Sequence, residues 1–131
     1  MRSFDAPRRR AAPASFTAVT LDGVQRSHTF RGITLVVAVK TRCDGCRDFL
    51  NASLQEFAPL DLIIVSACGD DEGEWVNAQH PVLIAPRLME QLDIRWPPFY
   101  VVIDASTSEV VSEGVVFAPE QVADEIAAFL A

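Results

Sequence analysis

The sequence predicts an α/β domain in which helices flank a mixed β-sheet that carries an N-terminal β-hairpin. Residues 33–39 and 61–67 are uninterrupted apolar runs of strand length, which is typical of buried central strands. Apolar residues at helical spacing follow each run, which indicates strand–helix–strand units. Strands at 99–103 and 110–117 and a helix at 120–130 complete the expected order.

The N-terminal part divides into an arm and a hairpin. Residues 1–15 predict a disordered basic arm, because they are rich in arginine and proline and show no apolar periodicity. Residues 16–21 alternate as a half-buried strand does, and the turn Asp22-Gly23 leads into a returning strand at 24–30. We therefore expect one domain over residues 16–131.

Three helices are predicted from local signals. The first runs from Asp44 to about Phe57, before a proline at 59. The second, at 86–92, has leucine and methionine at helical spacing. The last follows Pro119, since proline is favoured at the first position of a helix.

Charge and composition exclude several classes of protein. From residue 11 onward, seven basic side chains are outnumbered by seventeen acidic ones, so the domain repels a phosphate backbone and nucleic-acid binding is not expected. The longest uncharged apolar run, 33–39, is too short to span a bilayer. Residues 1–15 lack the apolar middle of a secretory signal, so we expect a cytoplasmic location, or export if a leader has been removed.

Two cysteines three residues apart, Cys43 and Cys46, lie where the strand at 33–39 meets the first helix. Such a pair can close an intrahelical disulfide and reopen it. The strand end exposes the first sulfur, and the start of the helix stabilises it as a thiolate. Arg42 adds a cation beside this sulfur and Asp44 opposes it, so the residues leave the redox direction open.

The order of elements resembles the thioredoxin fold, with Cys-x-x-Cys after the first central strand and a proline opening the third. The hairpin from Phe16 to Gly23 and the segment Pro98-Phe-Tyr-Val-Val-Ile-Asp104 resemble, more specifically, the redoxins related to the bacterial TlpA and ResA thiol-disulfide oxidoreductases. The resemblance covers roughly residues 16–131.

This resemblance implies a disulfide exchange reaction. Cys43 would be the attacking thiol, Cys46 the resolving thiol, and Pro98 a cis-proline whose loop holds the substrate peptide. The implied partners are a protein or small thiol/disulfide substrate and an upstream thiol reductant or oxidant, with no cofactor and no metal. The implied function is that of a thiol-disulfide oxidoreductase acting on protein disulfides.

Several residues depart from the family pattern. Arg42 replaces the usual Trp and would line the substrate site, while Trp96 either lines the same groove as a substitute or packs in the core. Val37 stands where thioredoxins bury an acid, and Phe49 stands where ResA-like proteins place a glutamate. Pro97 is also part of the implied substrate site but has no N–H for a substrate backbone. These differences favour an alternative, a redox-sensing or protein-binding module with weak or no turnover.

Other reactive residues lie outside the pair. Cys68 ends the second central strand on the side of the active-site turn, so it is either an extra redox thiol or a small buried or semi-buried free thiol. Zinc binding by the three cysteines and His80 is not expected, because structural zinc sites usually have a second tight ligand pair. The acidic run Asp70–Glu74 predicts a solvated loop.

Overall fold

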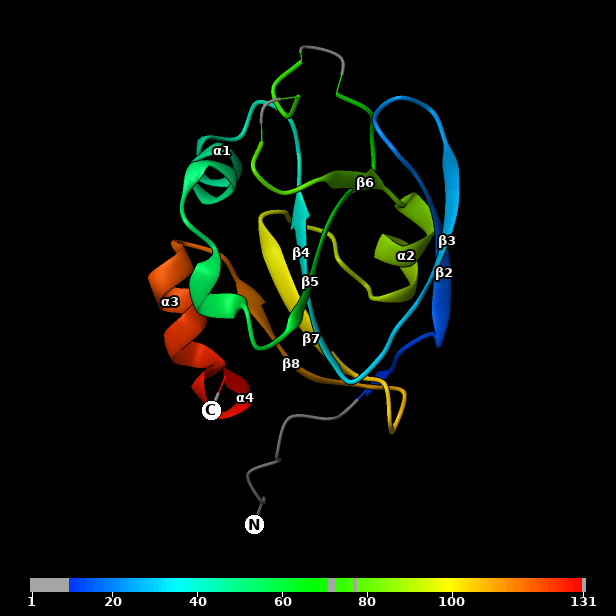
Figure 1. Ribbon diagram of the computed structural model, residues 1–131, viewed down its shortest axis with the longest axis vertical. Coiled ribbons are helices and arrows are strands. Elements are labelled where there is room, and N and C mark those ends of the chain that lie inside the picture. Colours follow the sequence, from blue (N-terminus) through cyan, green and yellow to red (C-terminus); the bar gives the residue numbers. More distant parts are fainter. Residues whose placement is uncertain (1–9, 71–72, 77, 131) are drawn as a thin grey trace.

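The computed structural model describes residues 10–70, 73–76 and 78–130 (Figure 1). The strands are β1 (Arg10–Ala11), β2 (Ser15–Val19), β3 (Gln25–Thr29), β4 (Ile33–Val39), β5 (Asp61–Ser66), β6 (Val82–Ile84), β7 (Phe99–Asp104) and β8 (Glu109–Val115). The helices are α1 (Asp44–Asn51), the 3₁₀ helix η1 (Gln55–Phe57), α2 (Pro86–Gln91), α3 (Pro119–Glu125) and α4 (Ala127–Leu130).

Within these ranges, the strands form one mixed sheet in the order β1-β8-β7-β4-β5-β6-β2-β3. The central strand β4 pairs in parallel with β5 and antiparallel with β7. Helices α1, α3 and α4 lie on one face of the sheet and α2 lies on the other (Figure 1). The predicted fold class, a mixed sheet flanked by helices with an N-terminal hairpin, is confirmed.

The central strand is apolar because both of its faces are covered. Leu35 and Val37 belong to the apolar cluster under α1 and α3, whereas Val36 and Ala38 belong to the cluster under α2. All four side chains are 0 % exposed. β4 therefore has the predicted bounds and is buried from Thr34 to its end at Val39, so the turn that follows it starts from a fixed position.

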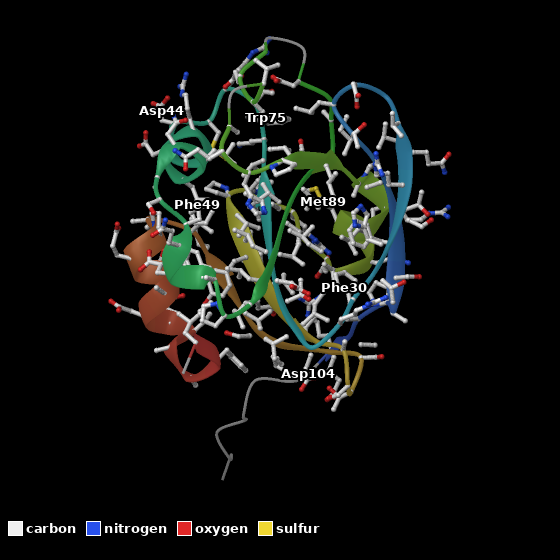
Figure 2. All side chains as sticks on the ribbon, viewed as in Figure 1. Phe30, Asp44, Phe49, Trp75, Met89 and Asp104 are labelled. Atoms are coloured by element: carbon white, nitrogen blue, oxygen red, sulfur yellow. A yellow bond between two sulfur atoms is a disulfide. The ribbon has the colours of Figure 1, made fainter. Side chains whose placement is uncertain are left out.

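The first helix is shorter than predicted, because the chain turns after Asn51 and re-enters the core through η1. On a continuous helix, Phe49 and Phe57 would lie about 12 Å apart along the axis. Their ring centroids are instead 6.2 Å apart, and both side chains are almost fully buried on the α1 face (Figure 2 labels Phe49). Stacking of the two rings thus accounts for the break.

The predicted disordered arm also needs correction. Residues 1–9 lie outside the described residues, but Arg10–Ala11 form β1 along the edge of β8. The Arg10 guanidinium donates to the Leu92 carbonyl at 2.7 Å and pairs with Glu113, and Ala12 is 8 % exposed. These contacts order the chain from residue 10, so the boundary at residue 15 is wrong.

Two further differences concern short elements. β6 was not predicted, since its three residues leave no periodic pattern, yet it pairs with the second half of β5. The last predicted helix is divided into α3 and α4 at Ile126. No helix in the described ranges is long and apolar enough to cross a membrane.

Candidate active site

Cys43 and Cys46 form a disulfide at the start of α1, with their Cα atoms 5.3 Å apart. Cys43 is the N-cap residue of the helix, and its Sγ accepts the backbone N–H of Cys46 at 3.1 Å. Cys46 is 0 % exposed, whereas Cys43 is only partly buried. Of the two sulfurs, that of Cys43 is therefore the one that a reactant in solution can approach.

The turn between β4 and α1 is held from two sides. The N–H of Lys40 donates to the Sγ of Cys46 at 3.4 Å. Arg42 adopts a left-handed backbone conformation with φ of 57°, and its N–H donates to both carboxylate oxygens of Glu74, at 3.0 and 3.3 Å. Sequence reasoning missed Glu74, because it lies 32 residues from Arg42 in a run predicted to be solvated. The tryptophan that follows Glu74 was the available signal that this loop returns to the core.

Pro98 lies against the active-site turn. A Cβ atom built on Gly45 would be 3.6 Å from the Cγ of Pro98, which is an ordinary van der Waals distance. The peptide bond between Pro97 and Pro98 is cis, and the Pro98 carbonyl accepts the N–H of Val116 at 3.0 Å. Trp96, next to this loop in sequence, is 78 % exposed, so its core-packing alternative is wrong.

The surroundings of the buried sulfur are apolar. Cys46 packs in one cluster with Val37 and Phe49, which are 0 % and 1 % exposed. Neither of these side chains can accept a proton. In a reduced pair, the Cys46 thiol would lie in this apolar environment, where burial disfavours the charged thiolate.

Cys68 is free and exposed, so the alternative of a buried thiol is wrong. It lies two residues beyond the end of β5, on a groove of about 400 Å³ that also borders the β4–α1 turn and α2. Thr41 and Pro97 line the same groove. The structure thus brings Cys68 to the side of the sheet that carries the turn and the proline loop, as the strand order predicted.

A polar network anchors the segment that follows β8. The hydroxyl of Tyr100 donates to Glu125 at 2.7 Å, and Gln121 donates to the same carboxylate and accepts the N–H of Phe117. Burial, with the hydrogen bond to Glu125, raises the pKa of Tyr100 to about 12. Hydrogen bonds from Gln121 and Tyr100 lower the pKa of Glu125. Phe117 directly follows Val116, whose N–H donates to the Pro98 carbonyl, and its side chain is 78 % exposed.

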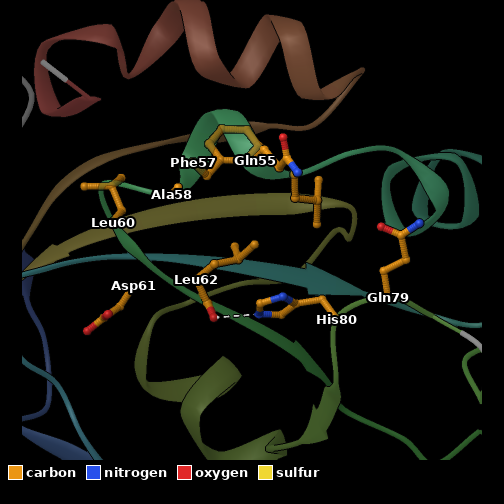
Figure 3. A pocket seen from close by; sticks show the side chains of 9 residues that line it. Gln55, Phe57, Ala58, Leu60, Asp61, Leu62, Gln79 and His80 are labelled. Atoms are coloured by element: carbon orange, nitrogen blue, oxygen red, sulfur yellow. Dashed lines mark hydrogen bonds between the residues drawn. The ribbon is translucent and has the colours of Figure 1, made fainter.

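A second pocket, of about 340 Å³, opens beside β5, and neither Cys43 nor Cys46 lines it (Figure 3). Its histidine, His80, has its Nε2 3.0 Å from the Leu62 carbonyl (dashed in Figure 3). Across residues 10–70, 73–76 and 78–130, no three histidine, cysteine or acidic side chains are grouped in a way that could hold a metal ion.

Solved structures similar to this chain include several thioredoxin-like proteins. The thioredoxin domain of a thiol-disulfide oxidoreductase from Bacteroides vulgatus superposes with a TM-score of 0.68, at 16% identity over 93% of this chain and 96% of that one. A thioredoxin-family thiol:disulfide interchange protein from Chlorobium tepidum gives 0.65, at 20% identity over 97% and 100%. The exposed lipoprotein thioredoxin of Streptococcus pneumoniae gives 0.64, at 18% identity over 89% and 98%.

In sequence the chain stands further apart. No protein-family model matches it, and no curated protein matches it. The structural likeness therefore shows the thioredoxin-like fold, and the chemistry has to be argued from the residues of the site.

Proposed function

We propose that this protein is a thiol-disulfide oxidoreductase in which Cys43 is the attacking thiol and Cys46 the resolving thiol. The observation that carries the proposal is the unequal placement of the two sulfurs at one helix start. The Sγ of Cys43 is accessible and accepts a helix N–H, whereas Cys46 is fully buried. A helix N-terminus favours a negative charge, so the accessible sulfur is the one stabilised as a thiolate.

The exchange follows in two steps. The Cys43 thiolate attacks one sulfur of a substrate disulfide, so that a mixed disulfide forms and the other substrate sulfur leaves as a thiolate. Cys46, after losing its proton to solvent, attacks the Cys43 Sγ, which closes the internal disulfide and releases the second substrate thiolate. Two electrons pass from the protein dithiol to the substrate. Run in reverse, the same steps oxidise a substrate dithiol.

The substrate would bind over the loop that contains Pro97 and Pro98. Pro98 lies against the Cys-x-x-Cys turn. Trp96 comes two residues before Pro98, Arg42 comes directly before Cys43, and both side chains are exposed. Pro97 can offer its carbonyl to an extended peptide but has no N–H to donate. We therefore propose a protein or small thiol/disulfide substrate held by one backbone hydrogen bond and by apolar contact with Trp96.

A redox-sensing or protein-binding module with weak turnover is the second candidate. The apolar, acid-free surroundings of Cys46 favour it, because nothing at Val37 or Phe49 can take the proton of the resolving thiol. The exposed thiol of Cys68 could exchange with Cys43 in either function.

Insulin reduction, combined with peptide mapping, separates these candidates. We expect the wild type to reduce insulin, and Cys46→Ser to accumulate a mixed disulfide on Cys43 without turnover. A reversible Cys43–Cys46 bond without insulin reduction supports the sensing module. If mild oxidant produces no such bond, both redox functions are wrong. Cys68→Ser is the matched control and keeps the internal bond.

A further inference from the structure

Glu74 reaches the active-site turn from a loop that is distant in sequence. Both of its carboxylate oxygens accept the N–H of Arg42, the residue that precedes Cys43. The contact brings an acidic side chain to the backbone of the residue that precedes the attacking cysteine, at a helix N-terminus that favours negative charge. Glu74 thus adds a negative charge to a turn whose own charged residues are Lys40, Arg42 and Asp44, the last of which pairs with Arg47.

The loop presents Glu74 in a fixed position. The carboxylate of Asp70 accepts the N–H of Glu74 at 2.6 Å and that of Trp75 at 2.8 Å. Trp75 is 3 % exposed and packs in the same apolar cluster as Cys46 and Phe49. Because the next residue is buried in the core, the Glu74 backbone is anchored where it meets the turn.

Glu74 supplies the turn with a hydrogen-bond acceptor from another segment of the chain. Arg42 has a positive φ of 57°, a conformation that costs a residue with a side chain about 1 kcal/mol or more. The exposed backbone N–H of Arg42 lies outside the regular sheet ladder, so it takes an acceptor from water or from another segment of the chain. Glu74 supplies one, while the N–H of Lys40 goes to the Cys46 sulfur. The two partners together orient the chain that carries Cys43.

We propose that Glu74 is a positioning residue for Cys43, which orients the turn through the Arg42 N–H and uses its negative charge to favour the disulfide over the dithiol. The inference deepens the proposed function and rests on it. A carboxylate destabilises a neighbouring thiolate. Its effect on the equilibrium between dithiol and disulfide is therefore small at low pH, where both thiols of the reduced pair are protonated, and grows as Cys43 ionises. One charge that water screens changes the thiolate fraction by about threefold.

Glu74→Gln separates charge from shape, because the amide oxygen can still accept the Arg42 N–H. Glu74→Ala removes both, and Glu56→Gln, at an exposed position of η1, is the matched control. The reduced proteins are alkylated with iodoacetamide from pH 5 to 10, and the labelled Cys43 peptide is quantified by mass spectrometry. The Cys43–Cys46 equilibrium is measured in glutathione buffers over the same range.

For Glu74→Gln we expect alkylation at pH 7 to be about threefold faster, with an unchanged plateau rate at high pH. The disulfide should open about threefold more readily once Cys43 ionises, which is a potential about 15 mV more positive. Glu74→Ala should share this shift and also unfold at a lower temperature. Coinciding pH–rate profiles for Glu74→Gln and Glu56→Gln would overturn the proposal. If no internal disulfide forms in the wild type, the proposed function fails, but the alkylation profiles still decide the role of Glu74.

Discussion

Gly114→Ala should destabilise the protein, because the site has no room for a methyl group. Gly114 lies on β8 directly opposite Tyr100 on β7. A Cβ atom there would be 2.9 Å from the Tyr100 Cε2 and 3.1 Å from both the Tyr100 hydroxyl and the Glu125 Oε1. Tyr100 is 2 % exposed, so core side chains prevent the ring from withdrawing.

The size of the effect follows from three contributions. Inserting a methyl group into a packed site costs about 1–3 kcal/mol. Displacing the tyrosine ring also strains its 2.7 Å hydrogen bond to Glu125, and loss of that bond would cost about 1 kcal/mol more. Alanine restricts the unfolded chain more than glycine does, which returns about 0.4–1 kcal/mol. We expect the free energy of unfolding to fall by about 1–3 kcal/mol.

Urea denaturation followed by tryptophan fluorescence measures this change, because Trp75 is buried in the fold. Gly69→Ala is the matched control, since a Cβ there would meet only the Ile84 Cδ1 at 3.8 Å. The reasoning is refuted if Gly114→Ala is as stable as the wild type. Disulfide formation by Cys43 and Cys46 should be unaffected in either variant.

Two further predictions concern stability. The pKa of Tyr100 is raised from 10.0 to about 12. The contribution of its protonated hydroxyl to the free energy of unfolding is therefore complete below pH 10 and is lost as the pH rises from about 10 to 12. With allowance for water around the exposed Glu125, we expect urea titrations to show that the free energy of unfolding falls by about 1–2 kcal/mol over that range. Tyr100→Phe should remove this pH dependence. Phe57→Ala should lower the free energy of unfolding by about 3–5 kcal/mol, since the ring is 1 % exposed and stacks on Phe49; a loss below 1 kcal/mol in the same titration would contradict the packing described for η1.

The parts of the fold that the sequence predicts well are those whose local pattern and buried position agree. β4 has the predicted bounds because a β-branched run is apolar on both faces in the sequence and covered on both faces in the structure. The end of α1 was missed, because the stacking of Phe57 on Phe49 is a tertiary contact that overrides a continuous helical pattern. β1 and β6 were missed because two or three residues are too few for a period.

The same distinction between local sequence patterns and tertiary contacts applies to the residues of the site. The positions of Cys43, Cys46 and the proline loop follow from the order of strands and helices, which fixes the ends of the sheet at which they lie. The contact between Glu74 and Arg42 could not be predicted, because it depends on how a long loop folds back over the turn. The exposure of Trp96 was equally open in the sequence, since an aromatic side chain before two prolines fits either the core or the surface.

The reduction potential of the Cys43–Cys46 pair tests the central claim most directly. The purified protein is equilibrated in glutathione buffers of increasing reducing strength, the thiols are trapped in acid, and the redox state of each cysteine is read by peptide mapping. We predict one reversible two-electron transition that links Cys43 to Cys46, that is lost in Cys46→Ser and that persists in Cys68→Ser. A pair that stays fully reduced or fully oxidised across the whole range of buffers would contradict the account.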